Sequence, residues 1–125
     1  MTDFHYICMF LKIIADILFV TLIFLINSDA YAKPTSIGAS IVSEASKLND
    51  KAYQPNPITI KQGDTIVWTN SDFGIHTVTE KKASFNSGFM HPNQTFEFTF
   101  NKSGIFEYIC EVHPTSMFGT VIVNP

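Results

Sequence analysis

The chain has 125 residues, 46% of them hydrophobic, and eight basic against eleven acidic residues give it a net charge of −3. A chain of this length holds one domain at most. It has no basic stripe, so nucleic acid is a poor candidate partner. All eight basic residues are lysines, which excludes a twin-arginine export signal.

Residues 1–32 have the pattern of an export leader. The segment Ile13–Ile26 is almost wholly apolar, and the small-x-small tripeptide that follows ends at Ala32. This pattern predicts a secretory signal peptide cleaved after Ala32. The apolar run is shorter than the roughly 20 residues of a membrane span. Because Lys12 is the only basic residue before the run and Asp16 lies inside it, a retained anchor is the alternative. We expect an exported, periplasmic or extracytoplasmic protein, tethered to the membrane only if the leader is retained.

Cleavage would leave residues 33–125 with Cys110 as their only cysteine, because Cys8 lies in the leader. A disulfide within the domain is then impossible, and a free thiol in an oxidising compartment is prone to oxidation or intermolecular pairing. Cys110 is therefore either a buried, inert side chain or a residue with a chemical role. The residues around Cys110 in the sequence indicate which of these two interpretations applies.

The rest of the chain consists of short apolar-polar alternations separated by turns. The pattern predicts strands, taken in chain order, over Ser36–Ser43, Pro57–Lys61, Thr65–Thr69, Ile75–Thr79, Gln94–Phe100, Ile105–Cys110 and Thr120–Val123. Residues 44–56 have room for a helical turn but are mostly loop, and Gly63-Asp64 marks a turn. The expected fold is a single all-β domain, an antiparallel β-sandwich over residues 33–125.

Alternation also predicts which side chains face the core. Aromatic residues occupy one parity of the strands near residues 96–100 and 106–108, and Trp68 shares its parity with Ile66. Cys110 has the parity of Tyr108, opposite the charged Glu107, so we expect its thiol to point inward.

The segment "YICEVHPTSMFG" places three possible ligands of a soft metal close together. Cys110 and His113 offer a thiolate and an imidazole from one tight loop, and Met117 follows four residues later. A mononuclear electron-transfer copper site uses a thiolate, two imidazoles and a weak axial thioether. Soft sulfur suits Cu(I) and nitrogen suits Cu(II), so such a set serves both oxidation states.

The second imidazole must come from elsewhere in the chain. Since His5 lies in the leader, the candidates are His76 and His91. His76 shares its parity with Val78, an expected inward position, whereas His91 precedes a proline in a turn where solvation is the ordinary outcome. We expect His76 to be the ligand.

Two regions of the chain resemble the signatures of a known family. "GDTIVWTNSDFGIHTVT" and "SGIFEYICEVHPTSMFGTVIV" are similar to the two signature regions of small blue copper proteins, the plastocyanin, amicyanin and pseudoazurin group of cupredoxins. The resemblance covers nearly all of residues 58–123, with both regions in the right order. It implies a Greek-key β-sandwich with one mononuclear type 1 copper site at one end.

The resemblance also implies the ligands His76, Cys110, His113 and Met117, and a role for Thr77 in bracing the cysteine loop. Three residues separate His113 from Met117, one more than in the amicyanin-like loop and one fewer than in the plastocyanin-like loop. The alternative for Met117 is an ordinary core or surface methionine.

The function that these features predict is one-electron transfer rather than enzymatic catalysis. Multicopper enzymes need further histidines, and only three lie outside the leader. The alternatives are a copper delivery or storage protein with the same ligands, and a structural zinc site, since zinc also accepts cysteine and histidine.

The expected partners are redox proteins, and we expect the chain to act as a monomer. Phe89, Met90, Pro114 and Phe118 could form an apolar collar around His113 on which such a partner docks. Ordinary loop packing is the alternative explanation of these side chains.

Overall fold

The structure is a computed structural model that describes residues 3–26 and 33–125. The chain divides into two units, with the boundary between Lys33 and Pro34. The first unit contains the helix α1 (Asp3–Ile26). Within the described ranges, no helix combines the length and the apolar character needed to cross a membrane. The predicted cleavage site at Ala32 lies outside the described residues, and cleavage stays a prediction.

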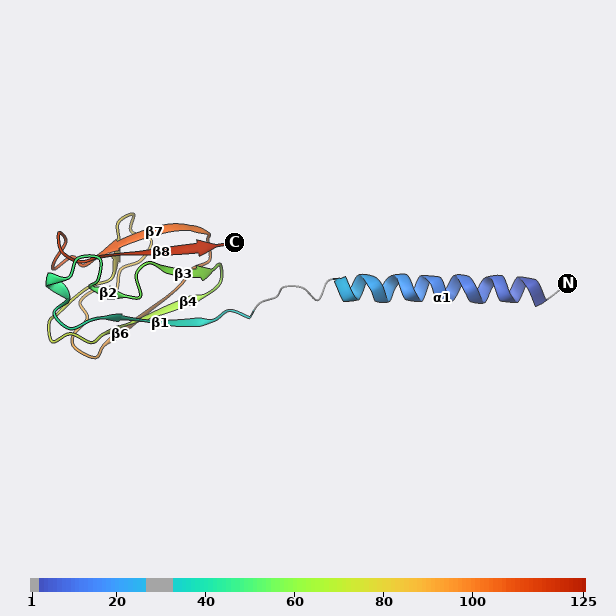
Figure 1. Ribbon diagram of the computed structural model, residues 1–125, viewed down its shortest axis with the longest axis horizontal. Coiled ribbons are helices and arrows are strands. Elements are labelled where there is room, and N and C mark those ends of the chain that lie inside the picture. The colour runs from blue at the N-terminus through green and yellow to red at the C-terminus, as the bar shows by residue number, and fades with distance from the viewer. Residues whose placement is uncertain (1–2, 27–32) are drawn as a thin grey trace. The chain divides into compact units, whose positions relative to one another are not determined.

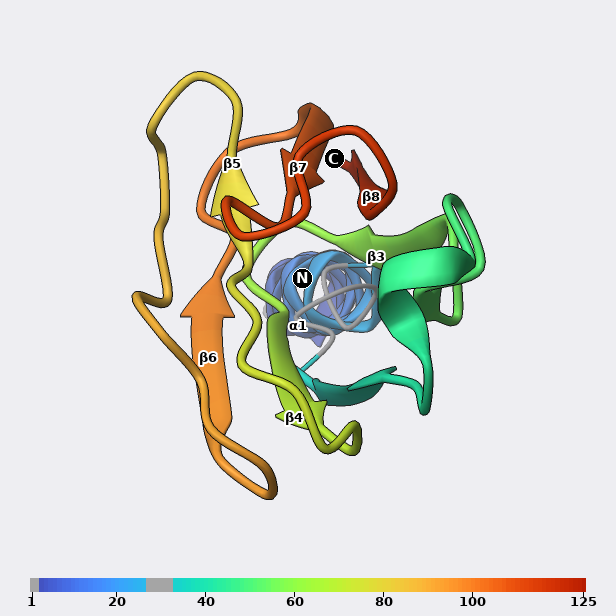
Figure 2. The same cartoon turned by 90° about the vertical axis from the view of Figure 1, so that its left-hand side faces the viewer.

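The second unit is a sandwich of two four-stranded sheets (Figures 1 and 2). The first sheet has the order β2-β1-β4-β6, with β1 at Ser36–Ile41, β2 at Tyr53–Gln54, β4 at Thr65–Asn70 and β6 at Thr95–Thr99. The second has the order β3-β8-β7-β5, with β3 at Ile58–Lys61, β5 at Thr79–Glu80, β7 at Gly104–Ile109 and β8 at Phe118–Asn124. The predicted all-β sandwich is confirmed.

The sheets are mixed rather than wholly antiparallel. Among the described strands, four pairings are antiparallel, whereas β1 pairs with β4 and β3 pairs with β8 in parallel. Between β1 and β4 the chain crosses to the other sheet to form β3 and then returns. This crossover brings β4 back beside β1 in the same direction, which strand alternation alone does not reveal.

The predicted strand Ile75–Thr79 is wrong over most of its length, since β5 begins only at Thr79. The backbone of His76 exchanges two hydrogen bonds with Met90 in an isolated bridge. The next amides donate to side chains, that of Thr77 to the Cys110 sulfur and that of Val78 to the Ser87 hydroxyl. The segment is extended, but these local partners replace a continuous ladder.

Residues 44–56 contain more structure than expected. The chain forms a 3₁₀ turn, η1 (Ala45–Lys47), and then the short strand β2. Tyr53 of β2 is fully buried, and its hydroxyl donates a hydrogen bond of 2.7 Å to the carbonyl of Thr77. This long-range contact fixes a segment whose own alternation is too short to predict a strand.

Aromatic side chains fill the core between the sheets as the alternation predicts. Trp68 of β4 is fully buried, and rings from β6, from β7 and from the chain outside the strands contact it: Phe85, Phe96, Phe100 and Tyr108. Its indole N–H donates to the Tyr108 hydroxyl at 3.4 Å, a polar link between β4 and β7 inside the core. Tyr108 and Cys110 are fully buried, so the inward parity of β7 is confirmed.

Asp64 closes the turn between β3 and β4. Its carboxylate accepts hydrogen bonds from the amide and the hydroxyl of Thr35, both at 2.8 Å, and from the amide of Lys61 at 2.9 Å. These hydrogen bonds hold the pKa of the Asp64 carboxyl below its ordinary value. Gly63 supplies the positive φ of 95° that the turn requires.

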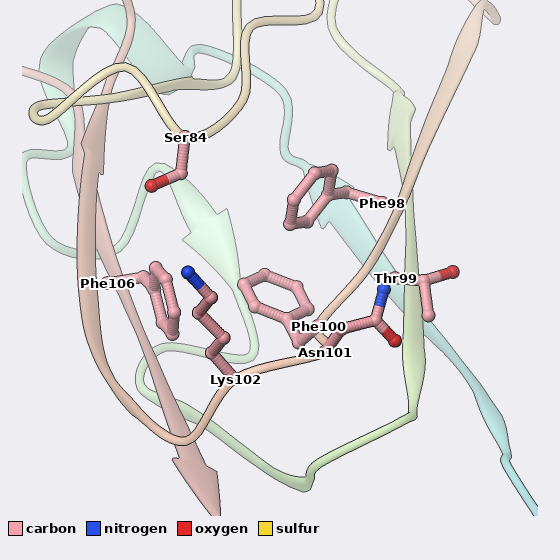
Figure 3. A pocket seen from close by; sticks show the side chains of 7 residues that line it. All are labelled: Ser84, Phe98, Thr99, Phe100, Asn101, Lys102 and Phe106. Carbon is pink, nitrogen blue, oxygen red and sulfur yellow. The ribbon is translucent and has the colours of Figure 1, made fainter.

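An open pocket lies beside the turn that leads into β7 (Figure 3). The pocket is lined by Ser84, Phe98, Thr99, Phe100, Asn101, Lys102 and Phe106. It lies near the start of β7, whereas Cys110 follows the end of that strand. The pocket therefore belongs to a different part of the sandwich from the predicted ligands.

Candidate metal centre

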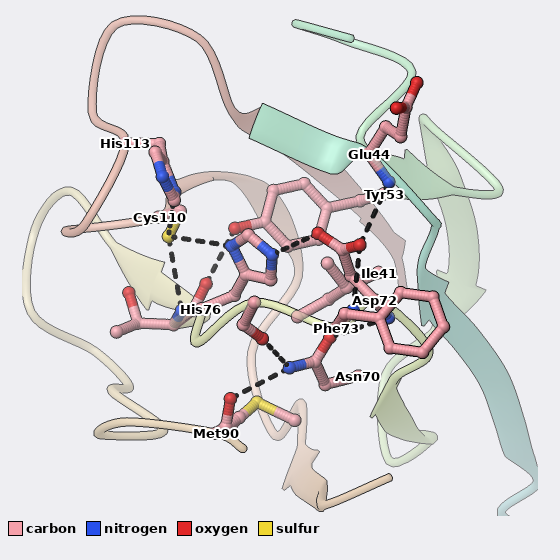
Figure 4. Close-up of polar contacts among 12 residues, drawn as sticks. Ile41, Glu44, Tyr53, Asn70, Asp72, Phe73, His76, Met90, Cys110 and His113 are labelled. Carbon is pink, nitrogen blue, oxygen red and sulfur yellow. Dashed lines mark hydrogen bonds and ion pairs between the residues drawn. The ribbon is translucent and has the colours of Figure 1, made fainter. Parts of the chain in front are cut away.

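Three of the predicted ligands converge at one end of the sandwich. The Cys110 Sγ lies 3.8 Å from the Nδ1 of His76 and 3.8 Å from the Nδ1 of His113 (Figure 4). One ligand atom from each of the three residues lies within 4.8 Å of the others. Cys110 and His76 are buried, whereas His113 is half-buried, so His113 is the predicted ligand of these three that reaches the surface.

Backbone hydrogen bonds close the loop that carries Cys110 and His113. The His113 amide donates to the Cys110 carbonyl at 3.1 Å, and the Met117 amide donates to the His113 carbonyl at 3.1 Å. The Cys110 amide in turn donates to the Met117 carbonyl at 3.1 Å. The loop therefore holds its donors in place through its own backbone, directly between β7 and β8.

Met117 lies at the base of this loop and is fully buried. Its backbone forms an isolated bridge with Asn49, which ties the loop to the segment after η1. Burial fits an axial thioether and also fits a core methionine. The assignment of Met117 as a ligand stays a prediction.

Thr77 braces the cysteine loop, as the family resemblance implied. Its amide donates to the Cys110 Sγ at 3.3 Å, and its hydroxyl accepts from the Glu111 amide at 2.8 Å. Its carbonyl accepts from the Tyr53 hydroxyl, whose pKa is raised by burial, so that this phenol stays a donor. An amide aimed at the sulfur stabilises a thiolate charge.

A carboxylate holds the outer edge of the His76 ring. The Nε2 of His76 lies 2.7 Å from the Oδ2 of Asp72. Partial burial acts to raise the pKa of the Asp72 carboxyl. The hydrogen bond from His76 and two backbone amides outweigh this effect, so the pKa lies below its ordinary value.

Asn70 shapes the loop between β4 and His76. Its side-chain amide donates to the carbonyls of Gly74 and Met90, at 2.8 and 2.9 Å, and its carbonyl oxygen accepts from the Asp72 amide at 3.0 Å. A Cβ on Gly74 would lie 3.2 Å from the Nε2 of His76. The loop therefore places Asp72 and His76 in contact, and it packs closely enough that a larger residue at position 74 would crowd the His76 ring.

The two candidates for the second imidazole have different surroundings. His76 joins Cys110 and His113 in the cluster, whereas His91 is exposed in its turn and is no member of that group. The amide of His91 donates to the side chain of Gln94 at 2.7 Å, a turn contact. The geometry therefore favours His76 over His91.

Asp72, Asn70 and Tyr53 support the site, although the sequence pattern alone does not predict a role for Asn70 or Tyr53. The spacing of Asp72 four residues before His76 was an available signal, since a carboxylate often supports a ligating histidine. Tyr53 gave no such signal, because it lies 24 residues from its partner Thr77.

The proposed apolar collar requires one correction. Met90 is only 2% exposed, because its backbone pairs with His76 and its side chain joins the core. Phe89 and Phe118 are 71% and 39% exposed, and Pro114 is also exposed. Three of the four predicted collar residues therefore lie at the surface.

The donor set fits copper. Two imidazole nitrogens and one sulfur suit copper in both common oxidation states, and such a set is also chemically open to zinc. The hydrogen bonds to Cys110 and His76 orient these donors without a metal. The chain's own residues thus provide a preformed site for a soft or borderline cation.

Known proteins share this architecture. The chain is 37% identical over 77 residues to amicyanin of Paracoccus versutus, with 58% of each chain covered. It is 32% identical over 83 residues to amicyanin-alpha of Methylorubrum extorquens, with 62% of this chain and 69% of that one covered. A purple cupredoxin from Nitrosopumilus maritimus superposes with a TM-score of 0.64 at 26% identity, covering 70% of this chain and 99% of the other.

The match to the first amicyanin spans little more than half of that protein's length. The profile of the family described as copper binding proteins, plastocyanin/azurin family, matches residues 40–124, which is most of the sandwich. The predicted cofactor, copper, and the cupredoxin fold are confirmed by this match and by the structural neighbour. The chain belongs to the plastocyanin/azurin family of copper-binding proteins.

Proposed function

We propose that the chain is an exported one-electron carrier whose His76, Cys110 and His113 would hold one copper ion, with Met117 as a weaker fourth ligand. The observation that carries this proposal is the convergence of the three donor atoms within 4.8 Å of one another. Copper, when bound, supplies the one-electron couple between Cu(I) and Cu(II).

The protein's own contribution is to keep the donors in place. Thr77 holds the Cys110 sulfur and Asp72 holds the His76 ring, and neither contact depends on the metal. A site held in this way changes little in shape when its charge changes, which favours fast electron exchange.

His113 is the proposed contact point for redox partners. It is the one member of the described cluster that is not fully buried, and the exposed Phe89, Pro114 and Phe118 are the apolar residues predicted to surround it. An apolar surface of this kind suits the brief docking of another redox protein. We propose that the chain docks through this surface as a monomer.

The burial of the metal-binding side chains favours a carrier role over copper delivery or storage. Two of the three donors, Cys110 and His76, are almost inaccessible to an acceptor protein or a competing ligand. Copper loss should then be slow compared with electron exchange. Rapid copper transfer to an added chelator, on the time scale of redox turnover, would favour delivery instead.

No substrate transformation is proposed. The described cluster offers three strong donors from one cysteine and two histidines, and the fully buried Met117 would complete the set. That arrangement leaves no accessible position for a substrate, as an enzyme would need.

Export rests on the leader. We propose that residues 1–32 are removed and that the protein works outside the cytoplasm. Intact mass of the protein from its host tests this proposal. A mature N-terminus at Lys33 is expected, and retention of Met1 would contradict cleavage of the leader.

The visible spectrum of the copper-loaded full chain tests the site. Charge transfer from a Cys110 thiolate to Cu(II) should produce strong visible absorption, and Cys110→Ser should abolish it. Cys8→Ser is the matched control, since Cys8 is exposed on α1, and it should keep the colour. The assignment fails if copper binds the wild type without colour, or if the Cys110→Ser variant is equally coloured.

A further inference from the structure

The Asp72 carboxylate is fully engaged by hydrogen-bond donors. Its Oδ2 lies 2.7 Å from the Nε2 of His76, and its Oδ1 accepts from the amides of Glu44 and Phe73 at 3.0 and 2.9 Å. Figure 4 shows this carboxylate between the His76 ring and the Glu44 backbone. The two carboxylate oxygens therefore have different partners. Oδ1 binds two backbone amides, and Oδ2 contacts the ring of His76.

An ionised carboxylate can only accept hydrogen bonds, so its partner nitrogen must carry the proton. In a neutral His76 ring that proton lies on Nε2. The Nδ1 then keeps its lone pair, and it is this atom that lies 3.8 Å from the Cys110 Sγ. Asp72 thus selects the tautomer that a metal ligand at Nδ1 requires.

Asp72 is also placed where its charge acts strongly. The His76 side chain is 1% exposed and the Asp72 side chain is 11% exposed, so little water lies around the pair. Charge interactions in such surroundings are weakened much less than in bulk water. A negative charge on the far side of the imidazole makes the ring a better donor to Cu(II) than to Cu(I).

We propose that Asp72 is the positioning residue of the metal centre: its carboxylate fixes the tautomer of His76 and, through that ring, lowers the reduction potential of bound copper. The effect on the potential rests on the proposed function. The effect on the tautomer concerns only residues of the chain and can be measured without copper.

The Oδ1 contacts identify a variant that separates these roles. In Asp72→Asn, the amide oxygen can still accept from Glu44 and Phe73, which preserves the loop. Its amino group then faces the Nε2 of His76, where two donors cannot meet. The ring must move its proton to Nδ1, the tautomer that cannot bind a metal there, as in catalytic triads whose aspartate is changed to asparagine.

The first experiment is nitrogen NMR of the metal-free protein at about pH 9, well above the ordinary imidazole pKa of about 6.5. The wild type should show His76 protonated at Nε2, and Asp72→Asn should show it protonated at Nδ1. Asp50→Asn is the control, because it removes the same charge from an exposed position, and it should match the wild type. Protonation at Nδ1 in the wild type itself would overturn the proposal.

The second experiment is voltammetry of the copper-loaded proteins. Asp72→Asn and Asp72→Ala should favour Cu(I) by at least tenfold, about 59 mV for a one-electron couple. Asp50→Asn should leave the potential unchanged. Asp72→Ala provides the result if the asparagine variant does not fold or loses copper. If a folded Asp72 variant keeps both the reduction potential and the His76 tautomer of the wild type, the proposal is wrong and Asp72 only stabilises the loop.

Failure of the proposed function has a different signature. A wild type that binds copper without colour would contradict the copper-thiolate assignment, while the NMR result would still decide the role of Asp72. If the copper-loaded wild type is coloured but its reduction potential does not depend on Asp72, the carrier proposal stands and the proposed role of Asp72 in the potential is rejected.

Discussion

The amide of Thr77 donates to the Cys110 Sγ at 3.3 Å while its hydroxyl accepts from the Glu111 amide at 2.8 Å. One residue therefore holds both the sulfur and the backbone that follows it. Because Thr77 comes directly after His76, the same segment positions two donors that lie 34 residues apart in sequence.

Thr77→Val should destabilise the protein by about 0.5–1.5 kcal/mol, the usual net contribution of one hydrogen bond, because the hydrogen bond that the Thr77 hydroxyl accepts from the Glu111 amide is only part-buried. Valine keeps the shape of threonine but removes the acceptor of the Glu111 amide. Thr77→Ser keeps that acceptor and is the matched control. Denaturant unfolding of the three metal-free proteins measures the difference, and equal stability of the valine variant would show that the hydroxyl is not needed.

Replacing His76 and replacing His91 by alanine should have different effects on copper binding. His76→Ala removes a buried donor and should weaken copper binding by more than about tenfold, with loss or change of the visible band. His91→Ala alters an exposed turn and should leave both unchanged. Copper titration by competition with a chelator checks this, and the reverse pattern would exchange the roles of the two residues.

Replacements of Met117 should move the reduction potential in opposite directions. Met117→Gln supplies a harder oxygen donor and should favour Cu(II), which lowers the potential. Met117→Leu removes the donor and should raise it. Shifts of about 59 mV or more, a tenfold change in the redox equilibrium, are expected in voltammetry. If neither variant moves the potential, Met117 is a core side chain and not a ligand.

Gly119→Ala should destabilise the fold by about 1–3 kcal/mol through overpacking. Its Cβ would overlap the ring of Tyr108, which is fully buried beside Trp68 and cannot move aside without disturbing the core. Gly38→Ala in β1 is the control, because its Cβ meets nothing within 4 Å. Thermal unfolding of both variants tests the prediction, which is wrong if the two melt alike.

Asp64 should contribute a stability that is lost in acid. Hydrogen bonds from Thr35 and Lys61 lower the pKa of its carboxyl in the folded state. Its contribution is therefore complete above the unfolded pKa of about 3.9 and disappears as the pH falls through the lower folded value. The stability gap between wild type and Asp64→Asn should be present at neutral pH and shrink below about pH 4. A gap that does not change with pH would exclude a role for the carboxylate charge.

The sequence predicted those parts of the fold and site that depend on local pattern. Alternation gave the strands around Trp68 and Tyr108 and the inward direction of Cys110. The tight spacing of Cys110 and His113 predicted their proximity, because three residues of chain cannot separate the two side chains widely. His76 followed from parity, although the segment around it is extended chain and not a strand.

The remaining features depend on contacts between distant segments. The parallel pairing of β1 with β4 arises from a crossover through the other sheet, which alternation does not encode. Tyr53 and Met90 have ordinary local sequences, and their burial follows from partners elsewhere in the chain. The spacing of Asp72 and His76 indicates a possible contact, but a loop aspartate is usually solvated, so the folded loop is needed to establish that its carboxylate meets His76.

His76 and Cys110 lie 34 residues apart in a domain in which no internal disulfide can form once the leader is removed. A metal bound at both ends would close this span into a ring, as a disulfide does, and would limit the freedom of the unfolded chain. Unlike a disulfide, this cross-link opens when the metal leaves. The lifetime of the folded protein would then follow the supply of copper, because molecules without metal would unfold first.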